Sequence, residues 1–193
     1  NMATTARPAD PERYFVVLEK EAPPLFFDAL EADSGWTTGG ITGGGITTTW
    51  ERGAPLNVGP FSGADGSVNC FGTNIRDDYD VDADIWLRSP PIELTAPGLT
   101  GVRLTFEHYP DIEPDFDSGT IRVLRASDDT PLGQPIAENI DGATFPFDWQ
   151  SFSADLPPEA IGETIKLEFQ FESDEGGFGF AGWYIDNVEL KAR

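Results

Sequence analysis

Cysteine, histidine and basic residues are scarce in this sequence of 193 residues, and their scarcity removes several classes of function. The single cysteine, Cys70, excludes an internal disulfide framework and a zinc site built on two or more thiolates. With 12 Lys and Arg against 34 Asp and Glu, the net charge of -22 repels phosphate backbones and anionic lipid head groups. No run approaches the roughly 20 apolar residues of a membrane helix. We therefore expect no nucleic-acid partner and no membrane insertion.

Motifs for nucleophilic, metallopeptidase or nucleotide chemistry are also absent from the sequence. The one histidine, His108, ends a strand pattern, where a partly buried residue held by a hydrogen bond is expected rather than a proton shuttle. Cys70 is expected to be a buried free thiol. A hydrolase working through two carboxylates stays an alternative, since a pair about 5 to 9.5 Å apart suffices for glycoside hydrolysis. With 34 acids such a pair arises without any catalytic role.

Alternation of apolar and polar residues with period two indicates strands along most of the chain. The clearest segments are Val102–Phe106 and Ile165–Phe171. Further strands are expected at Tyr14–Glu19, Leu25–Glu31, Ile46–Trp50, Ser67–Ile75, Ile85–Ser89, Thr120–Ala126, Gln150–Asp155 and Gly182–Leu190. Turn residues separate these runs, and the one expected helical turn is Pro158–Ile161. The pattern predicts an all-β fold, an antiparallel two-sheet jelly-roll β-sandwich.

The chain is expected to hold one such domain, over residues 14–193, because all-β sandwiches of this length form a single core. Residues 1–13 show no pattern and are expected to be a linker or remnant. The opening Asn1-Met2 indicates a fragment excised from a longer protein.

Three acidic clusters have the spacing of oxygen ligands, and calcium prefers six to eight hard oxygens from loops. The first resembles an EF-hand loop, but counting from Asp78 it has Ala83 at the turn and Ser89 in place of the final Glu. Each cluster is either a cation site or a solvated acidic loop. Their members are Asp77, Asp78, Asp80, Asp82 and Asp84 in the first, Asp111, Glu113, Asp115 and Asp117 in the second, and Asp174 and Glu175 in the third.

Several aromatic residues outside the clearest strands are candidates for stacking on sugar rings, with core or rim packing as the alternative for each. Trp36 and Trp183 are expected in the core. The candidate ligand-binding residues are Tyr79, Trp86, Tyr109 and Trp149, with Trp50 as a further possibility.

Seven short motifs follow one another in the order of a known family. The first motif is Phe27–Glu31 followed by Gly35-Trp36, the next five lie at 50–53, 72–74, 83–94, 104–108 and 116–119, and the last is Gly182–Leu190. Over Leu25–Leu190 the chain resembles the bacterial MAM-like domains beside secreted metallopeptidases of the immune inhibitor A type. It is more loosely similar to calcium-binding jelly-roll carbohydrate-binding modules. Unlike animal MAM domains it lacks their cysteines, which weighs against a cell-adhesion role.

The resemblance implies that the acids of the opening and closing strands, Glu31 and Asp186, are ligands of a structural Ca²⁺ ion. Asp33, Asn74 and Asp174 are weaker additions to this set. The alternation of the closing strand slips between Ile185 and Val188, which independently predicts a bulge at Asp186. An inward carboxylate there needs either a cation or hydrogen bonds from loop amides.

We therefore expect a non-catalytic accessory module of a secreted or cell-surface bacterial protein, which is stabilised by calcium. Its partners would be polysaccharide or glycoprotein and the neighbouring domains of the parent chain, for which the resemblance implies a peptidase. The alternative is a structural spacer or assembly domain that binds only calcium and its neighbours.

Overall fold

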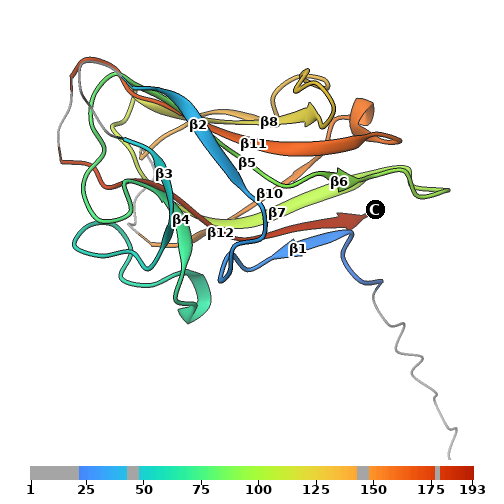
Figure 1. Cartoon of the computed structure of the whole chain (residues 1–193), viewed down its shortest axis with the longest axis horizontal. Helices are drawn as coiled ribbons and strands as arrows, with labels where there is room; N and C mark the ends of the chain where they lie inside the picture. Colours follow the sequence, from blue (N-terminus) through green and yellow to red (C-terminus); the bar gives the residue numbers. More distant parts are fainter. Residues whose placement is uncertain (1–21, 43–47, 143–147, 177–178) are drawn as a thin grey trace, which may run out of the picture.

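The computed structural model describes residues 22–42, 48–142, 148–176 and 179–193, and shows strands joined by loops with two short 3-10 helices among them (Figure 1). The 3-10 helices are η1 (Ala64–Gly66) and η2 (Pro158–Ala160). The strands are β1 (Phe26–Asp28), β2 (Thr37–Thr42), β3 (Trp50–Gly53), β4 (Cys70–Thr73), β5 (Ala83–Arg88), β6 (Ile92–Glu93), β7 (Val102–Asp111), β8 (Ser118–Arg125), β9 (Ala137–Ile140), β10 (Gln150–Asp155), β11 (Thr164–Glu172) and β12 (Gly182–Ala192).

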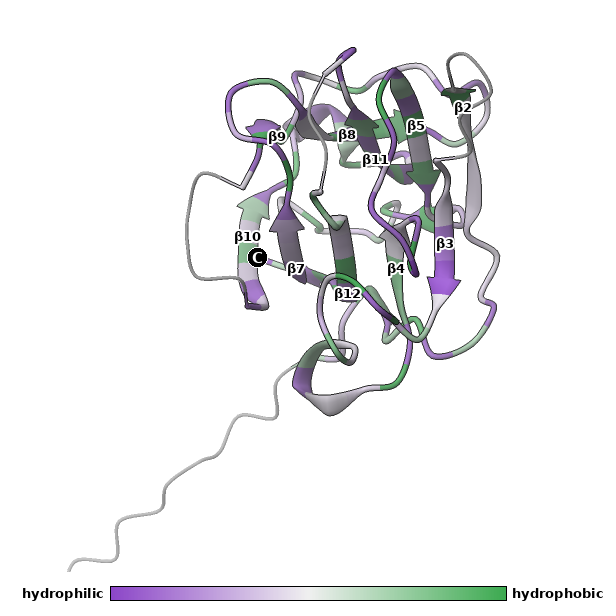
Figure 2. Ribbon diagram, turned by 90° about the vertical axis from the view of Figure 1, so that its left-hand side faces the viewer, coloured by the Kyte–Doolittle hydropathy of each residue, from purple (hydrophilic) through white to green (hydrophobic). Residues whose placement is uncertain are grey.

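The strands form two antiparallel sheets, which confirms the predicted β-sandwich. The first sheet has the order β10-β7-β12-β4-β3, and Figure 2 shows these five strands side by side. Strand β1 also pairs with β12. The second has the order β2-β5-β11-β8-β9, with β6 also paired to β11. Neighbours in each sheet are mostly distant in sequence, so the fold depends on long-range pairing.

Most predicted strands are present, and the helical turn at Pro158 is the helix η2. The segment Tyr14–Glu19 lies outside the described residues, as does the start of Ile46–Trp50. Three strands carried no usable alternation: β2 contains Gly39 and Gly40, β6 has two residues, and β9 lies at a sheet edge.

The core lies between the two sheets and is rich in aromatic rings. Phe106 and Phe171 are buried, and Phe169 contacts both Phe106 and Trp183 with ring centroids 5.2 and 5.8 Å apart. Trp183 is fully buried as predicted, whereas Trp36 is half-buried and packs against the core through Phe169. The inward faces read from the alternation of β7 and β11 are therefore confirmed.

Strand β12 carries the predicted bulge. Its pairing with β7 shifts register between Asp186 and Glu189, and Asn187 adopts a positive φ of 51°. The extra residue lets Ile185 and Val188 face the same core. One edge of β12 pairs with β7 throughout, while the other pairs with β4 before the bulge and β1 after it, where Phe26 lies opposite Leu190.

A smaller core covers part of the first sheet on its other side. Cys70, Tyr109 and Tyr184 are buried there, and Val58 and Trp149 pack against them. Tyr109 and Tyr184 meet edge to face with centroids 6.0 Å apart. The long connection between β3 and β4 thus packs onto the sheet. Among the described residues, no helix is long and apolar enough to span a membrane.

Candidate functional site

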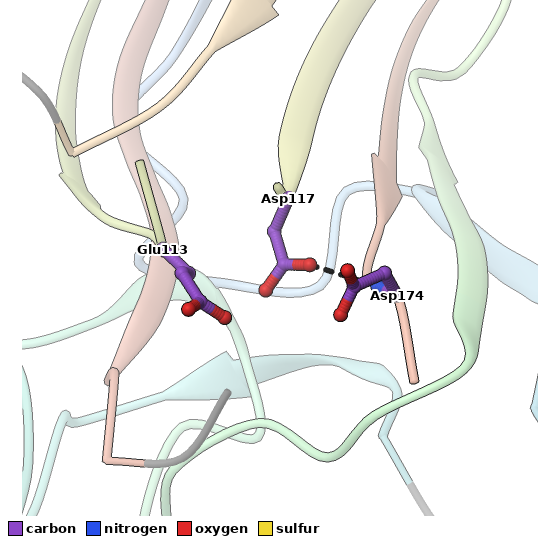
Figure 3. Close-up of side chains that lie close together, drawn as sticks. All are labelled: Glu113, Asp117 and Asp174. Atoms are coloured by element: carbon purple, nitrogen blue, oxygen red, sulfur yellow. Dashed lines mark hydrogen bonds between the residues drawn. The ribbon is translucent and has the colours of Figure 1, made fainter. Parts of the chain in front are cut away.

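The second and third acidic clusters meet at one end of the sandwich. Glu113 and Asp117 belong to the connection between β7 and β8, and Asp174 follows β11. One carboxylate oxygen of each lies within 4.8 Å of the others, the only such meeting of three acids, cysteines or histidines in the described ranges. Figure 3 shows the three carboxylates turned toward a common space. We refer to Glu113, Asp117 and Asp174 as the three-acid cluster.

A tyrosine hydroxyl and two backbone N–H groups donate hydrogen bonds that fix the carboxylates of Asp117 and Asp174. Asp117 is buried, and its Oδ2 accepts a bond of 2.5 Å from the Tyr79 hydroxyl, while its Oδ1 accepts the Asp174 N–H at 2.8 Å. Asp174 Oδ1 in turn accepts the N–H of Gly176 at 2.7 Å. The positions of these two carboxylates are thus set by the fold.

Glu113 is the member of the cluster whose charge is poorly compensated. Its Oε2 atom is buried and has no hydrogen-bond partner among the described residues. The pKa of Glu113 is raised by desolvation and by the charges of Asp117 and Asp174. In the described parts of the chain, no Lys or Arg forms an ion pair with any of the three acids. Such an arrangement has the hard oxygens and the excess negative charge that Ca²⁺ prefers.

Glu31 and Asp186, the expected calcium ligands, converge on one loop, residues 63–69. Asp186 is fully buried, and its Oδ2 accepts bonds from Ala64 N–H at 2.8 Å and the Ser67 hydroxyl at 2.7 Å. Its Oδ1 accepts the Asn187 N–H at 2.7 Å. The pKa of Asp186 is raised mainly by burial, and the charge of Glu31 adds to this.

Glu31 holds the other end of loop 63–69. Its Oε1 accepts the N–H groups of Val68 and Asn69 at 2.7 and 3.3 Å, and its Oε2 accepts the side-chain amide of Asn69 at 2.9 Å. The bond from Val68 is the main cause of a lowered pKa at Glu31. Of the two readings left open by the sequence, loop amides are thus observed around both acids, and a calcium ion between them stays a prediction.

The weaker ligand candidates lie elsewhere. Asp33 accepts the N–H of Gly35 in a local turn, and Asn74 accepts the Thr49 N–H at 3.1 Å and donates to the carbonyl of Asp78. Asp174 belongs to the three-acid cluster. Within the described residues, the first acidic cluster brings no three acids within ligand distance. Asp77, Asp78 and Asp80 line a pocket that also contains Arg76.

The aromatic candidates are less available than the sequence indicated. Tyr79 and Tyr109 are each only 8% exposed, so of the two alternatives for their rings, packing is observed and stacking on sugars is contradicted. Tyr79 packs on Phe171 and holds Asp117, and Tyr109 belongs to the smaller core. Trp50, the further possibility, is buried against Trp183. Trp50 and Tyr79 belong to the core between the sheets and Tyr109 to the smaller core, and alternation within one strand does not reveal which segments cover a ring.

Trp86 and Trp149 are half-buried and already have partners. The Arg88 guanidinium carbon lies 4.0 Å from the centre of the Trp86 ring, and Gly39 lies so close that a Cβ there would meet the ring at 2.3 Å. The Trp149 indole N–H donates to the carbonyl of Ser62 at 3.2 Å.

The aromatic rings that do reach solvent were missed. Phe27, Phe61 and Phe116 are 55%, 99% and 67% exposed. The signal for Phe27 was its position beside Phe26, because adjacent strand residues point to opposite faces. The sequence reasoning also missed Asp28, whose Oδ2 accepts the Trp36 indole N–H at 2.8 Å.

His108 and Cys70 lie in the interior, as expected. The ring of His108 packs edge-on against Phe106 with centroids 5.5 Å apart, and burial lowers its pKa to about 4. Its Nδ1 has no hydrogen-bond partner among the described residues, in contrast to the hydrogen bond expected there. Cys70 is a buried free thiol, whose pKa is raised by desolvation and by nearby acids.

Comparison with known proteins relates the chain to part of a peptidase and to β-sandwich domains. No family model matches it. Over 180 residues, 92% of this chain is 34% identical to Bacillopeptidase F of Bacillus subtilis (strain 168), and it spans only 12% of that protein.

Two solved structures show the fold. The K1 cleaved adhesin domain of Lys-gingipain from Porphyromonas gingivalis W83 has a TM-score of 0.59 at 17% identity, covering 87% of this chain and 98% of that one. A carbohydrate-binding-module structure from the β-sandwich superfamily has a TM-score of 0.53 at 14% identity, covering 83% and 58%. The chain is thus a β-sandwich domain similar in sequence to a small part of a bacterial peptidase. The narrower MAM-like resemblance stays a prediction.

Proposed function

We propose that this domain is a non-catalytic accessory module of a secreted bacterial peptidase, which holds its fold with calcium and binds a glycan or glycoprotein. The similarity to a 12% portion of Bacillopeptidase F supports the setting in a larger peptidase. The adhesin and carbohydrate-binding domains of the same fold support a binding role over a catalytic one. The observation that carries the calcium part is the three-acid cluster.

In this proposal Glu113, Asp117 and Asp174 supply carboxylate oxygens to one Ca²⁺ ion. The residues fit such an ion because Tyr79 and backbone N–H groups fix two carboxylates, while Glu113 keeps an unpartnered buried oxygen. When bound, the ion neutralises the repulsion among the acids. The connection between β7 and β8 would then be joined to the segment that follows β11.

The calcium proposal is tested by calorimetry of the purified domain in excess calcium and in chelator. At a thousandfold excess over the dissociation constant, calcium should stabilise the folded state by about 4 kcal/mol. For a domain of this size that raises the melting temperature by roughly 8 to 16 °C.

The variant Glu113→Gln should abolish most of this calcium-dependent shift, because it removes the least compensated charge of the cluster. Asp77→Asn is the matched control, since Asp77 is an exposed acid outside the cluster, and it should keep the shift. If Glu113→Gln keeps the full shift while Asp186→Asn loses it, the ion lies between Glu31 and Asp186 instead. If chelator leaves the wild-type melting curve unchanged, the calcium proposal fails.

The binding role is tested by retention of the domain on immobilised neutral and acidic polysaccharides and on glycoproteins. A binding module should be retained by at least one of them. Retention by none would leave the spacer role and overturn the binding proposal.

A further inference from the structure

We propose that a neutral glycan chain binds in an open groove on the outer face of the first sheet, between β1, β7, β12 and η1. The groove has a volume of about 550 Å³, within the usual range for small-ligand sites. It is distinct from the three-acid cluster and from all four aromatic residues that the sequence suggested. The inference rests on the proposed binding function and names its surface. We refer to this site as the β1 groove.

One register row supplies the platform of the β1 groove. Phe27 of β1 lies opposite Glu189 of β12, which lies opposite Thr105 of β7, so their side chains share one face. Phe26 takes the core side of β1 and packs toward Trp36, which leaves the Phe27 ring 55% exposed. An aromatic ring beside hydrogen-bonding side chains suits a sugar ring, which has an apolar face and a rim of hydroxyl groups.

The polar lining of the β1 groove can accept and donate hydrogen bonds. Glu107 and Glu189 provide carboxylate oxygens, which accept from hydroxyl groups, and the Asn187 amide does both. The Ser151 hydroxyl donates to Glu107, and the Lys191 ammonium lies 3.0 Å from Glu189. Both carboxylates are therefore held in position at the edge of the groove.

Charge restricts the occupant. Asp65, Glu107 and Glu189 line the groove, Lys191 offsets one of them, and the whole chain has a net charge of -22. This field opposes uronates, sulfated glycans and phosphate polymers. The same field attracts a basic peptide, but two of the three acids already have partners, Glu107 in the Ser151 hydroxyl and Glu189 in the Lys191 ammonium. The aromatic platform beside donors and acceptors therefore favours an uncharged polyhydroxyl chain.

The wall of the β1 groove is formed before any ligand arrives. Ala64, Asp65 and Ser67 belong to loop 63–69, which Asp186 anchors through bonds to Ala64 and Ser67 and which Glu31 holds at its other end. A preformed wall lowers the ordering cost of binding. Glu31 and Asp186 are thus positioning residues for the groove.

The test is titration calorimetry of the purified domain with neutral oligosaccharides, namely the hexasaccharides of β-1,4-xylose, β-1,4-glucose, β-1,3-glucose and β-1,4-mannose. Oligogalacturonate is the anionic comparison and a Lys-rich peptide the cationic one. At least one neutral hexasaccharide should bind, whereas oligogalacturonate should not. Phe27→Ala and Glu107→Gln should each raise the dissociation constant roughly tenfold or more, as expected for residues central to an interface.

Phe61→Ala is the matched control, because Phe61 is 99% exposed and does not line the β1 groove. It should leave the dissociation constant unchanged, and all three variants should keep the wild-type melting temperature. Binding that survives both Phe27→Ala and Glu107→Gln would overturn the groove while leaving the binding module intact. Binding of no glycan would overturn both, and binding of the Lys-rich peptide alone would overturn the choice of occupant.

Discussion

Asp186→Asn is expected to lower the free energy of unfolding by about 1 to 3 kcal/mol. The buried carboxylate accepts three bonds, from Ala64, Ser67 and Asn187. An asparagine whose oxygen faces Ala64 and Ser67 keeps two of them, but its amide group then faces the Asn187 N–H. A buried donor left without an acceptor costs about 1 to 3 kcal/mol.

Urea denaturation of the wild type and of Asp186→Asn, each in excess calcium and in chelator, measures this loss. If Asp186 acts by anchoring loop 63–69, the difference between the two proteins is the same in both solutions. A calcium ion held by Glu31 and Asp186 would instead enlarge the loss in calcium by up to about 4 kcal/mol. Asp33→Asn is the control, since Asp33 is exposed and accepts only the nearby Gly35 N–H. A loss below about 0.5 kcal/mol in both solutions would refute the hydrogen-bond reasoning.

Four further outcomes concern three buried residues and one glycine of β2. The folded-state pKa of His108 is about 4, below its ordinary value of 6.5, so its contribution of about 3 kcal/mol is present above pH 6.5 and is lost as the pH falls to 4. Denaturation above pH 6.5 and at pH 4 should show a fall in the free energy of unfolding that is larger in the wild type than in His108→Leu by this amount. An equal fall in both proteins would contradict the assignment. Phe169→Ala should cost about 3 to 5 kcal/mol in urea denaturation, whereas a cost under about 1 kcal/mol would mean that the faces of β11 are reversed. Gly40→Ala should cost at least about 1 kcal/mol, because φ is 133° and a Cβ would lie 2.2 Å from the Asp84 carbonyl oxygen; an unchanged melting temperature would show that β2 adapts. Cys70 should react with a thiol reagent only at the rate of unfolding, and fast labelling of the native protein would show that the smaller core opens.

Most strands of the sandwich could be predicted from the sequence because the alternation of apolar and polar residues is a local property of each strand. The alternating residues of β7 and β11 face the core as predicted, and the slip after Ile185 located the bulge beside Asp186. Strand β2 escaped because Gly39 and Gly40 have no side chains to alternate. Alternation thus predicts a strand only where apolar side chains lie on the buried face and polar side chains on the other.

The candidate site was less predictable because it depends on which loops meet. The acids around Glu113 and Asp174 were recognised as separate clusters, but their meeting requires the end of β11 to lie beside the start of β8, where Glu172 pairs with Ser118. The burial of Tyr79 likewise depends on distant segments, because its ring packs on Phe171 and its hydroxyl bonds to Asp117, a residue 38 positions away. Neither the meeting of the acids nor the burial of Tyr79 produces a periodic pattern in the sequence.

The pairing of β1 with β12 also determines how the domain would respond to mechanical force. Leu25 donates its N–H to the Leu190 carbonyl at 2.7 Å, and Phe26 lies opposite Leu190, so the chain arrives and departs at neighbouring points. Tension between flanking segments would therefore load the hydrogen bonds of β1 one after another, as in peeling, instead of all together in shear. Only three residues of β1 pair with β12, and Phe27, the platform of the β1 groove, is the middle one. Pulling on the domain would thus detach the proposed ligand platform first, together with Phe26, which packs against the margin of the core.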